Sequence, residues 1–169
     1  MTFQIGEKVV YPNQGVGTIE NISSRSFGCG FETFYLLRFC CNSMTVLVPL
    51  STAAHIGLRR IAKEREMSRI LSFLAHGRCA ASGDWKIRFR ENSEKMQSGC
   101  LYAVAEVLKG LLQVQLEKPL SFRDKKTLDR ARHMLISELS IVRGVSEAQA
   151  VSLLERALSK ASLALPMAS

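Results

Sequence analysis

The spacing of the apolar residues changes near residue 60, and this change constrains the fold more than any other feature of the sequence. Before it, short apolar runs are interrupted by Gly, Asn, Ser and Pro, which is typical of strands joined by turns. The predicted strands are GEKVVYP (6–12), VGTIENISSRSF (16–27), FETFYLLRFC (31–40) and MTVLVPL (44–50), separated by NQG (13–15), GCG (28–30) and CNS (41–43). This spacing predicts a small, strongly bent β-sheet or barrel.

A module this short buries little surface, so we expect its core to depend on aromatic side chains. The aromatic residues concerned are Phe3, Tyr11, Phe27, Phe31, Phe34, Tyr35 and Phe39.

After residue 60 the apolar residues recur at three- and four-residue intervals, which is typical of amphipathic helices. The sequence predicts helices over 58–77, 82–99 and 101–118, one opened by Ser121 with Asp124, and one opened by Ser146 with Gln149. Ser82 or Asp84 is expected to cap the second helix, because short polar side chains accept from free backbone N–H groups there. The expected fold class is therefore α+β, with a small β module followed by a compact all-α bundle of four to five helices. We expect domains over 1–58 and 59–160, and a flexible tail over 161–169.

The composition is that of an ordinary globular protein, with 47% hydrophobic and 22% charged residues in 169. It argues against a disordered or fibrous chain. The sequence has no run of about 18 apolar residues, so a membrane span is not expected. The start, MTFQIGEKVV, lacks the basic residues followed by an apolar stretch that mark a signal peptide. We therefore expect a cytoplasmic protein.

The net charge is +8, from 23 Lys and Arg against 15 Asp and Glu, and such an excess favours a polyanionic partner. Residues 1–60 carry five basic and three acidic side chains, a net of +2, which leaves +6 for residues 61–169. We expect the helical half to meet the anion.

The cysteines and histidines form no pattern typical of a metal site or a catalytic site. The five cysteines are Cys29, Cys40, Cys41, Cys79 and Cys100, with no CxxC pair, and the histidines are His55, His76 and His133. We expect reduced thiols that behave as small apolar groups, and neither a metal, a cofactor nor an enzymatic activity. The enzymatic alternative would use Cys79 or Cys100 near His76.

Several segments, in order, resemble one family of bacterial proteins. They are IGEKVVYPNQGVGTIENI, a Phe-rich strand and TVLVPL, then DWKIRFRENSEKMQSG, VAEVLKGL and LSFRDKKTLDRARHMLISELS. This series resembles the CarD/CdnL family of transcription regulators over about residues 2–160, and its first part resembles the polymerase-interacting domain of transcription-repair coupling factors.

The resemblance implies a Tudor-like β module that docks on the β subunit of RNA polymerase, at its protrusion lobes. It implies a helical domain that lies against promoter DNA at the upstream edge of the melted region. A tryptophan there enters the minor groove as a wedge and favours the open complex. The expected function is thus a non-enzymatic transcription regulator, monomeric and associated with the nucleoid through polymerase. The alternative is a basic nucleic-acid-binding accessory protein that does not dock on polymerase.

Trp85 is the only tryptophan, and two interpretations of it compete. A lone tryptophan is often a core residue, and Trp85, Phe89, Asn92 and Met96 fall on one helical face. Yet Trp85 stands in the first turn of its helix among cations, which suits an apolar wedge at a base step. The resemblance favours the wedge, with Phe89 and Met96 packing inward to orient the ring.

Two basic clusters are expected to contact the DNA backbone as a set. They comprise Lys86, Arg88 and Arg90 beside Trp85, and the stretch 123–132, within which Lys125 and Lys126 lie in the first turn of a helix. Cations gain nothing from the dipole there, whereas basic side chains and free N–H groups can hold a phosphate. The structural alternative is that these residues are merely solvated or pair with Glu91, Glu94 or Asp129.

In the β module, the resemblance assigns polymerase contacts to Arg25, Phe27 and Leu47. Arg25 aligns with a family arginine that contacts the β subunit, and its alternative is an ordinary exposed turn residue. Leu47 stands where the family usually has a second basic residue. This departure predicts either a more apolar interface or a weaker affinity for polymerase.

Overall fold

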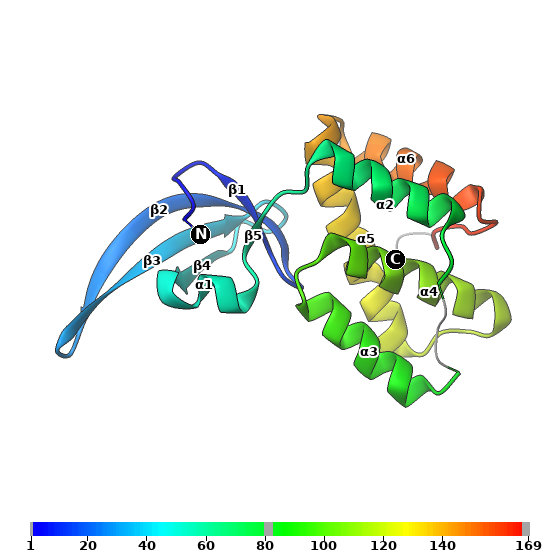
Figure 1. The fold of residues 1–169 in the computed structure, drawn as a ribbon, viewed down its shortest axis with the longest axis horizontal. Helices are drawn as coiled ribbons and strands as arrows, with labels where there is room; N and C mark the ends of the chain where they lie inside the picture. Colours follow the sequence, from blue (N-terminus) through cyan, green and yellow to red (C-terminus); the bar gives the residue numbers. More distant parts are fainter. Residues whose placement is uncertain (1, 80–82, 167–169) are drawn as a thin grey trace.

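The structure is a computed structural model that describes residues 2–79 and 83–166. An antiparallel sheet is followed by helices, with α1 between its fourth and fifth strands (Figure 1). The strands are β1 (Lys8–Tyr11), β2 (Gly15–Phe27), β3 (Gly30–Phe39), β4 (Thr45–Pro49) and β5 (Arg59–Arg60), in the order β4-β3-β2-β1-β5. The helices are α1 (Leu50–Ile56), α2 (Glu64–His76), α3 (Trp85–Gln97), α4 (Leu101–Glu117), α5 (Phe122–Arg143) and α6 (Glu147–Ser159). The predicted α+β fold class is confirmed.

The β2–β3 hairpin is the longest feature of the sheet and extends beyond the other strands (Figure 1). Its register runs from Gly17 opposite Phe39 to Phe27 opposite Gly30, with a bulge between Ile19 and Asn21. Gly17 is required where the strands approach closely, because a Cβ there would lie 2.7 Å from the Leu37 side chain and 2.9 Å from the Arg38 carbonyl oxygen.

One face of the sheet is covered by α1 and holds a small core. Its buried residues are Phe3, Val9, Ile19, Tyr35, Leu37, Phe39, Val48, Ala53 and Leu58. The aromatic prediction is thus confirmed for Phe3, Phe34, Tyr35 and Phe39, and Tyr11 packs against this core. Phe27 and Phe31 are exposed at 59% and 85%, and both lie at the tip of the hairpin, where β2 and β3 pair without β4.

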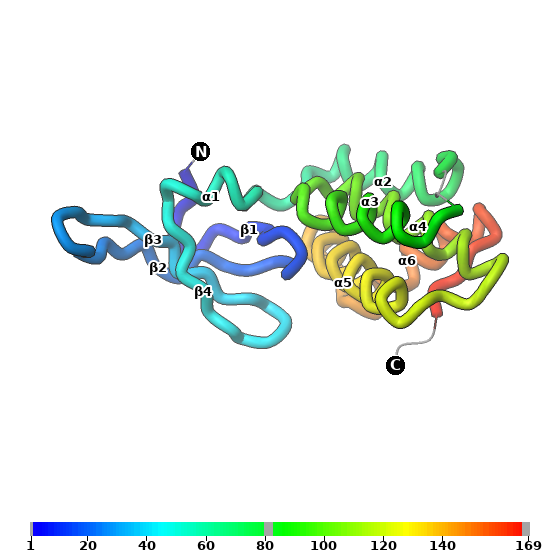
Figure 2. The backbone as a smooth tube through the Cα atoms, turned by 90° about the horizontal axis from the view of Figure 1, so that it is seen from below, coloured from blue at the N-terminus to red at the C-terminus, as the bar shows by residue number. Residues whose placement is uncertain are grey.

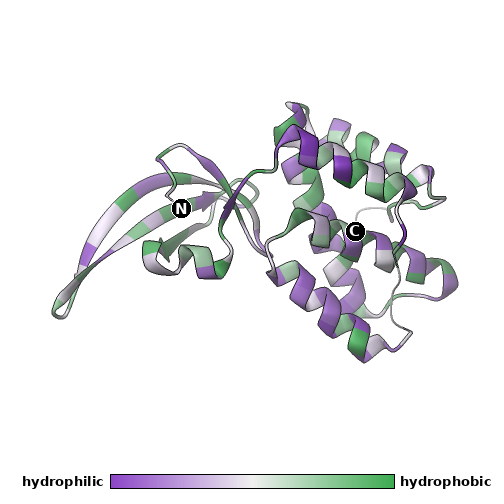
Figure 3. Cartoon of the chain, in the orientation of Figure 1, coloured by the Kyte–Doolittle hydropathy of each residue, from purple (hydrophilic) through white to green (hydrophobic). Residues whose placement is uncertain are grey.

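The helices form a second core around α4, whose apolar residues face α2, α3 and α5. Figure 3 shows that hydrophilic residues dominate α3, which lies at the edge of this bundle. Val10 and Val16 also belong to this core, because the β1–β2 turn packs against α5 (Figure 2). The sheet and the helices are therefore in direct contact.

The predicted caps are confirmed at three helices. Asp84 accepts from the Lys86 N–H at the start of α3, Ser121 from the Asp124 N–H at α5, and Ser146 with Gln149 forms a capping box at α6. Ser82, the other candidate cap of α3, lies outside the described residues.

The start of the first predicted helix was wrong. Residues 59 and 60 pair with Val10 and Val9 as β5, so α2 begins only at Glu64. The backbone groups of these two residues form hydrogen bonds with the open edge of β1 in place of the hydrogen bonds of a helix. The short helix α1 was not predicted, since seven residues carry too little periodicity.

The predicted domain boundaries stay a prediction. In the stretch expected to be a tail, residues 167–169 lie outside the described part, and Leu163 is buried at 5% exposure.

Candidate functional site

Among the described residues, one thiol is partly buried and no cluster of metal ligands occurs. No group of three or more His, Cys, Asp or Glu side chains there could hold a metal. Cys79 is partly buried beside α4, and burial raises the pKa of its thiol, which disfavours the nucleophilic thiolate at neutral pH. None of the described helices is long and apolar enough to cross a membrane.

The three residues predicted to bind polymerase lie on one face of the sheet. Cross-strand partners share a face, and Arg25 pairs with Glu32 while Leu47 pairs with Leu36. Side chains alternate along a strand, so the even-numbered residues of β3 share a face with Arg25, Phe27 and Leu47. On that face Phe34 is buried at 8% exposure, and Glu32 accepts from the Ser51 hydroxyl at the start of α1. Glu32 and Leu36 are four residues apart, so Arg25 and Leu47 are offset by roughly 13 Å along the strand direction, and they lie two strands apart.

Two apolar side chains on this face, Phe27 and Leu47, are exposed. Phe27 is 59% exposed and packs edge-on against Phe34, with ring centroids 5.8 Å apart. Leu47 is 36% exposed. The Arg25 guanidinium makes no hydrogen bond or ion pair with any described residue. We call Arg25, Phe27, Phe34, Leu36 and Leu47 the outer sheet face.

A second surface forms where α3 and α5 begin. Trp85 is the first residue of α3 and is 55% exposed, so it is not a core residue. The Lys86 ammonium lies 5.7 Å from the centroid of its ring. Met96, three turns along the same helix, is buried, and Phe89 is half-buried beneath the Arg123 guanidinium, 5.5 Å away. The predicted inward packing of Phe89 and Met96 thus accompanies an outward Trp85.

Arg88 is a correction to the predicted DNA contacts. Its side chain is 5% exposed, and its Nη2 lies 3.2 Å from Oδ2 of Asp124, which is equally buried. A guanidinium in this position cannot reach a phosphate. Arg88 precedes Met96 by eight residues, about two turns, so the two buried side chains lie on the same face of α3. Arg88 instead ties the start of α3 to the start of α5.

The remaining predicted cations are exposed on this surface. Lys86, Arg90, Lys125 and Lys126 all face solvent. Among the described residues, Lys125 and Arg90 form no ion pair, so neither is neutralised within the chain. The Asp124 charge is matched internally by Arg88. Fewer backbone N–H groups are free to bind a phosphate than predicted. Ser121 already accepts from the Asp124 N–H, and the Asp84 carboxylate accepts from the Lys86 N–H.

Phe122 was missed from the sequence. It is the first residue of α5, 72% exposed, and the Lys126 ammonium lies 4.7 Å from its ring centroid. An aromatic residue directly after a capping serine, with a lysine four positions on, is the signal that could have found it. We call Trp85, Lys86, Arg90, Phe122, Lys125 and Lys126 the α3–α5 surface.

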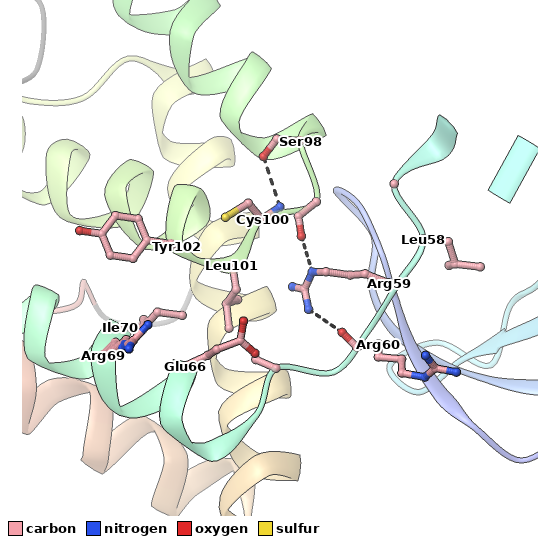
Figure 4. A pocket seen from close by; sticks show the side chains of 13 residues that line it. Leu58, Arg59, Arg60, Glu66, Arg69, Ile70, Ser98, Cys100, Leu101 and Tyr102 are labelled. Atoms are coloured by element: carbon pink, nitrogen blue, oxygen red, sulfur yellow. Dashed lines mark hydrogen bonds between the residues drawn. The ribbon is translucent and has the colours of Figure 1, made fainter. Parts of the chain in front are cut away.

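The two surfaces are connected through a buried carboxylate on α5. Glu138 is 1% exposed and accepts from Arg59 Nη1 at 2.7 Å, Arg59 Nη2 at 2.9 Å and the Ala62 N–H at 2.7 Å. Arg59 also donates through Nε to the Gly99 carbonyl (Figure 4). These bonds fix the segment from β5 to α2 against α5 and the α3–α4 turn.

A cavity of about 560 Å³ opens beside this junction. Figure 4 shows Arg59, Glu66, Leu101 and Cys100 around it. Glu66 accepts from the Lys63 N–H, and Arg59 is held by Glu138, so the charged groups of the wall are largely engaged within the chain.

Comparison with known proteins places both halves of the chain in one group. Residues 3–62 match the model of the CarD-like/TRCF RID domain, and residues 69–155 match that of the CarD C-terminal domain. A protein of Bacillus subtilis (strain 168) named "Putative transcription factor YdeB" is 34% identical over 147 residues, which cover 87% of this chain and 96% of that protein.

Proposed function

The chain belongs to the CarD family of transcription regulators, and from this premise we propose that it binds the β subunit of RNA polymerase and stabilises the open promoter complex. Residues 1–58 dock on polymerase, and residues 59–160 contact promoter DNA at the upstream edge of the melted region. One copy carries both surfaces, so it acts as a monomer without a metal or a cofactor.

The outer sheet face is the proposed docking surface. The unengaged Arg25 guanidinium supplies a charge that a carboxylate of the β subunit can pair with. Phe27 and Leu47 supply exposed apolar area on the same face. Aromatic residues and arginine are the side chains that most often dominate binding between proteins. With Leu47 in place of a basic residue, this interface is more apolar than the family's usual one.

The α3–α5 surface is the proposed DNA contact. Lys86, Arg90, Lys125 and Lys126 are exposed cations on two helices that the Arg88–Asp124 pair holds together. Phosphate contacts of this kind position a protein on DNA but carry no base information. Binding therefore shows little sequence preference, and the promoter is selected by polymerase.

Trp85 is the observation that carries the proposal. Its large apolar ring is 55% exposed beside a lysine ammonium, so it is available to a ligand in the free protein. α3 is 13 residues long, so Trp85 lies roughly 20 Å from the helix end that abuts the junction with the sheet. That distance suits a wedge that reaches past the docked sheet and enters the minor groove, where inserted apolar side chains unstack base steps.

Two assays with the full chain test the proposal. The chain is first titrated against RNA polymerase without DNA, and the polymerase–promoter complex is then footprinted with and without it. We expect binding in the first assay and added protection at the upstream edge of the melted region in the second. Binding to DNA without binding to polymerase at micromolar concentration would instead identify an accessory nucleic-acid-binding protein.

A further inference from the structure

Phe122 exposes an aromatic ring on a positively charged surface, and the proposed wedge does not account for it. Its side chain is 72% exposed, more than that of Trp85. Its one described ring contact is with the Lys126 ammonium, 4.7 Å from the centroid. An exposed ring of this size contributes little to folding and is available to a ligand.

Phe122 and Trp85 have the same local arrangement. Each is the first residue of its helix, and each has a lysine ammonium over its ring, Lys86 in one case and Lys126 in the other. In each case a π face and a cation lie side by side at the exposed start of a helix.

The two rings stand on one rigid frame. The buried Arg88–Asp124 pair joins α3 to α5, and Arg123 covers the Phe89 ring across the same interface. Trp85 precedes Arg88 by three residues and Phe122 precedes Asp124 by two, so each ring lies about one helical turn or less from that link. The starts of α3 and α5 are therefore fixed relative to each other.

The charge around Phe122 selects the chemistry of the ligand. Arg123, Lys125 and Lys126 are exposed within four residues of the ring, and the nearby Asp124 carboxylate is buried against Arg88. An aromatic face beside cations is the arrangement that binds single-stranded nucleic acid, in which a base stacks on the ring and its phosphate meets the cation. An intact duplex keeps its bases stacked and offers no such face.

We propose that Phe122 is a second stacking residue, which binds an unpaired base of melted DNA. Lys126 holds the adjacent phosphate. The inference rests on the proposed function and adds to it a residue and a DNA form, the unpaired strand. Stacking is tolerant of sequence, because every base has a π face.

The test compares two DNA probes at low salt, where phosphate contacts are strongest. One is an uninterrupted duplex, and the other has the same sequence with a short internal stretch of mismatched, unpaired bases. The full chain and the variants Phe122→Ala and Phe122→Leu are titrated against both by fluorescence anisotropy. Leu116→Ala on α4, where the side chain is 70% exposed, is the matched control for removing exposed apolar area.

We expect Phe122→Ala to weaken binding to the mismatched probe about tenfold, which corresponds to ~1.4 kcal/mol. Binding to the duplex should change less than about twofold, because phosphate contacts are untouched. Phe122→Leu should lose as much as Phe122→Ala, since leucine keeps apolar area without a π face. Leu116→Ala should bind both probes as the unsubstituted chain does, and no variant should change the melting temperature.

Three results would overturn the inference. They are equal affinity of Phe122→Ala and the unsubstituted chain for the mismatched probe, retained affinity in Phe122→Leu, and a loss that accompanies a lowered melting temperature. If the unsubstituted chain prefers the mismatched probe but Phe122→Ala does too, only this inference fails. If the unsubstituted chain binds neither probe, the proposed DNA contact fails with it. An acidic protein partner for Phe122 would show as unchanged DNA binding in Phe122→Ala.

Discussion

Breaking the Arg59–Glu138 pair should destabilise the chain unequally, depending on which partner is removed. Glu138 is 1% exposed, whereas the Arg59 side chain is 23% exposed. Arg59→Ala leaves a buried carboxylate with only the Ala62 N–H, while Glu138→Ala leaves a guanidinium that can turn partly toward water. Breaking a buried pair costs about 3–5 kcal/mol, so we expect about 3 kcal/mol for Glu138→Ala and about 5 kcal/mol for Arg59→Ala.

Thermal unfolding monitored by circular dichroism checks this order. For a chain of this length each kcal/mol lowers the melting temperature by about 2–4 °C, so Glu138→Ala should lose roughly 6–12 °C and Arg59→Ala more. The melting temperature of the double variant should fall by less than the sum of the two single losses, because each single variant leaves one charged side chain without its partner. Glu155→Ala, which removes an exposed carboxylate on α6, is the matched control.

The same pair should matter for positioning. Glu138→Ala should still bind polymerase, since the outer sheet face is untouched, but it should stabilise the open complex less because α5 no longer fixes the β5–α2 segment. Melting temperatures of both single variants within about 2 °C of Glu155→Ala, or fully additive losses, would refute the reasoning.

Three further predictions concern docking, DNA and pH. Arg25→Glu should weaken binding to polymerase by about 2–5 kcal/mol in a two-component titration, while Leu47→Arg leaves it unchanged or tighter; unaltered binding of Arg25→Glu would remove Arg25 from the interface. Affinity for duplex DNA should fall by about 0.9 log unit per log unit of salt for each phosphate contacted, and Lys125→Glu with Lys126→Glu should flatten this slope; a flat slope in the unsubstituted chain contradicts the phosphate contacts. The Gln4 backbone N–H and the Arg60 side chain hold the pKa of Glu7 below its usual value of 4.5, so the stability that Glu7 adds is present above that value and is lost as pH falls through the lower, folded-state pKa. The melting temperature of Glu7→Gln should therefore lie below that of the unsubstituted chain at pH 7, and a gap that persists or widens on acidification would contradict the assignment.

The sequence predicted the element types well where local signals were strong. Ser121 and Ser146 marked helix starts because capping is a property of a few neighbouring residues. Arg59 and Arg60 were assigned to a helix because their neighbours carry helical spacing, and the sheet edge that captured them lies fifty residues earlier in the chain. A stretch of a few neighbouring residues contains no sign of pairing over such a separation.

The candidate site was predicted only in part, because some of its features also depend on residues far away in the sequence. Trp85 could be placed at a helix start, but only the structure shows it exposed at 55%. Arg88 looked like its neighbours Lys86 and Arg90, and its burial depends on Asp124, which is 36 residues away. Glu138 carried no local signal at all, since its partners lie 76 and 79 residues earlier.

The central claim is that Trp85 acts on DNA and not in the core, and one preparation of Trp85→Ala tests it by two readouts. Melting temperature and the half-life of the open complex are measured together, with Trp85→Phe as the conservative variant. A ring that is 55% exposed should leave the melting temperature within about 4 °C, whereas loss of a core tryptophan costs about 3–5 kcal/mol. We predict that Trp85→Ala still binds polymerase, that the open-complex half-life falls about tenfold or more, and that Trp85→Phe restores part of it. A large drop in melting temperature, with activity falling only in proportion to the unfolded fraction, would contradict the account.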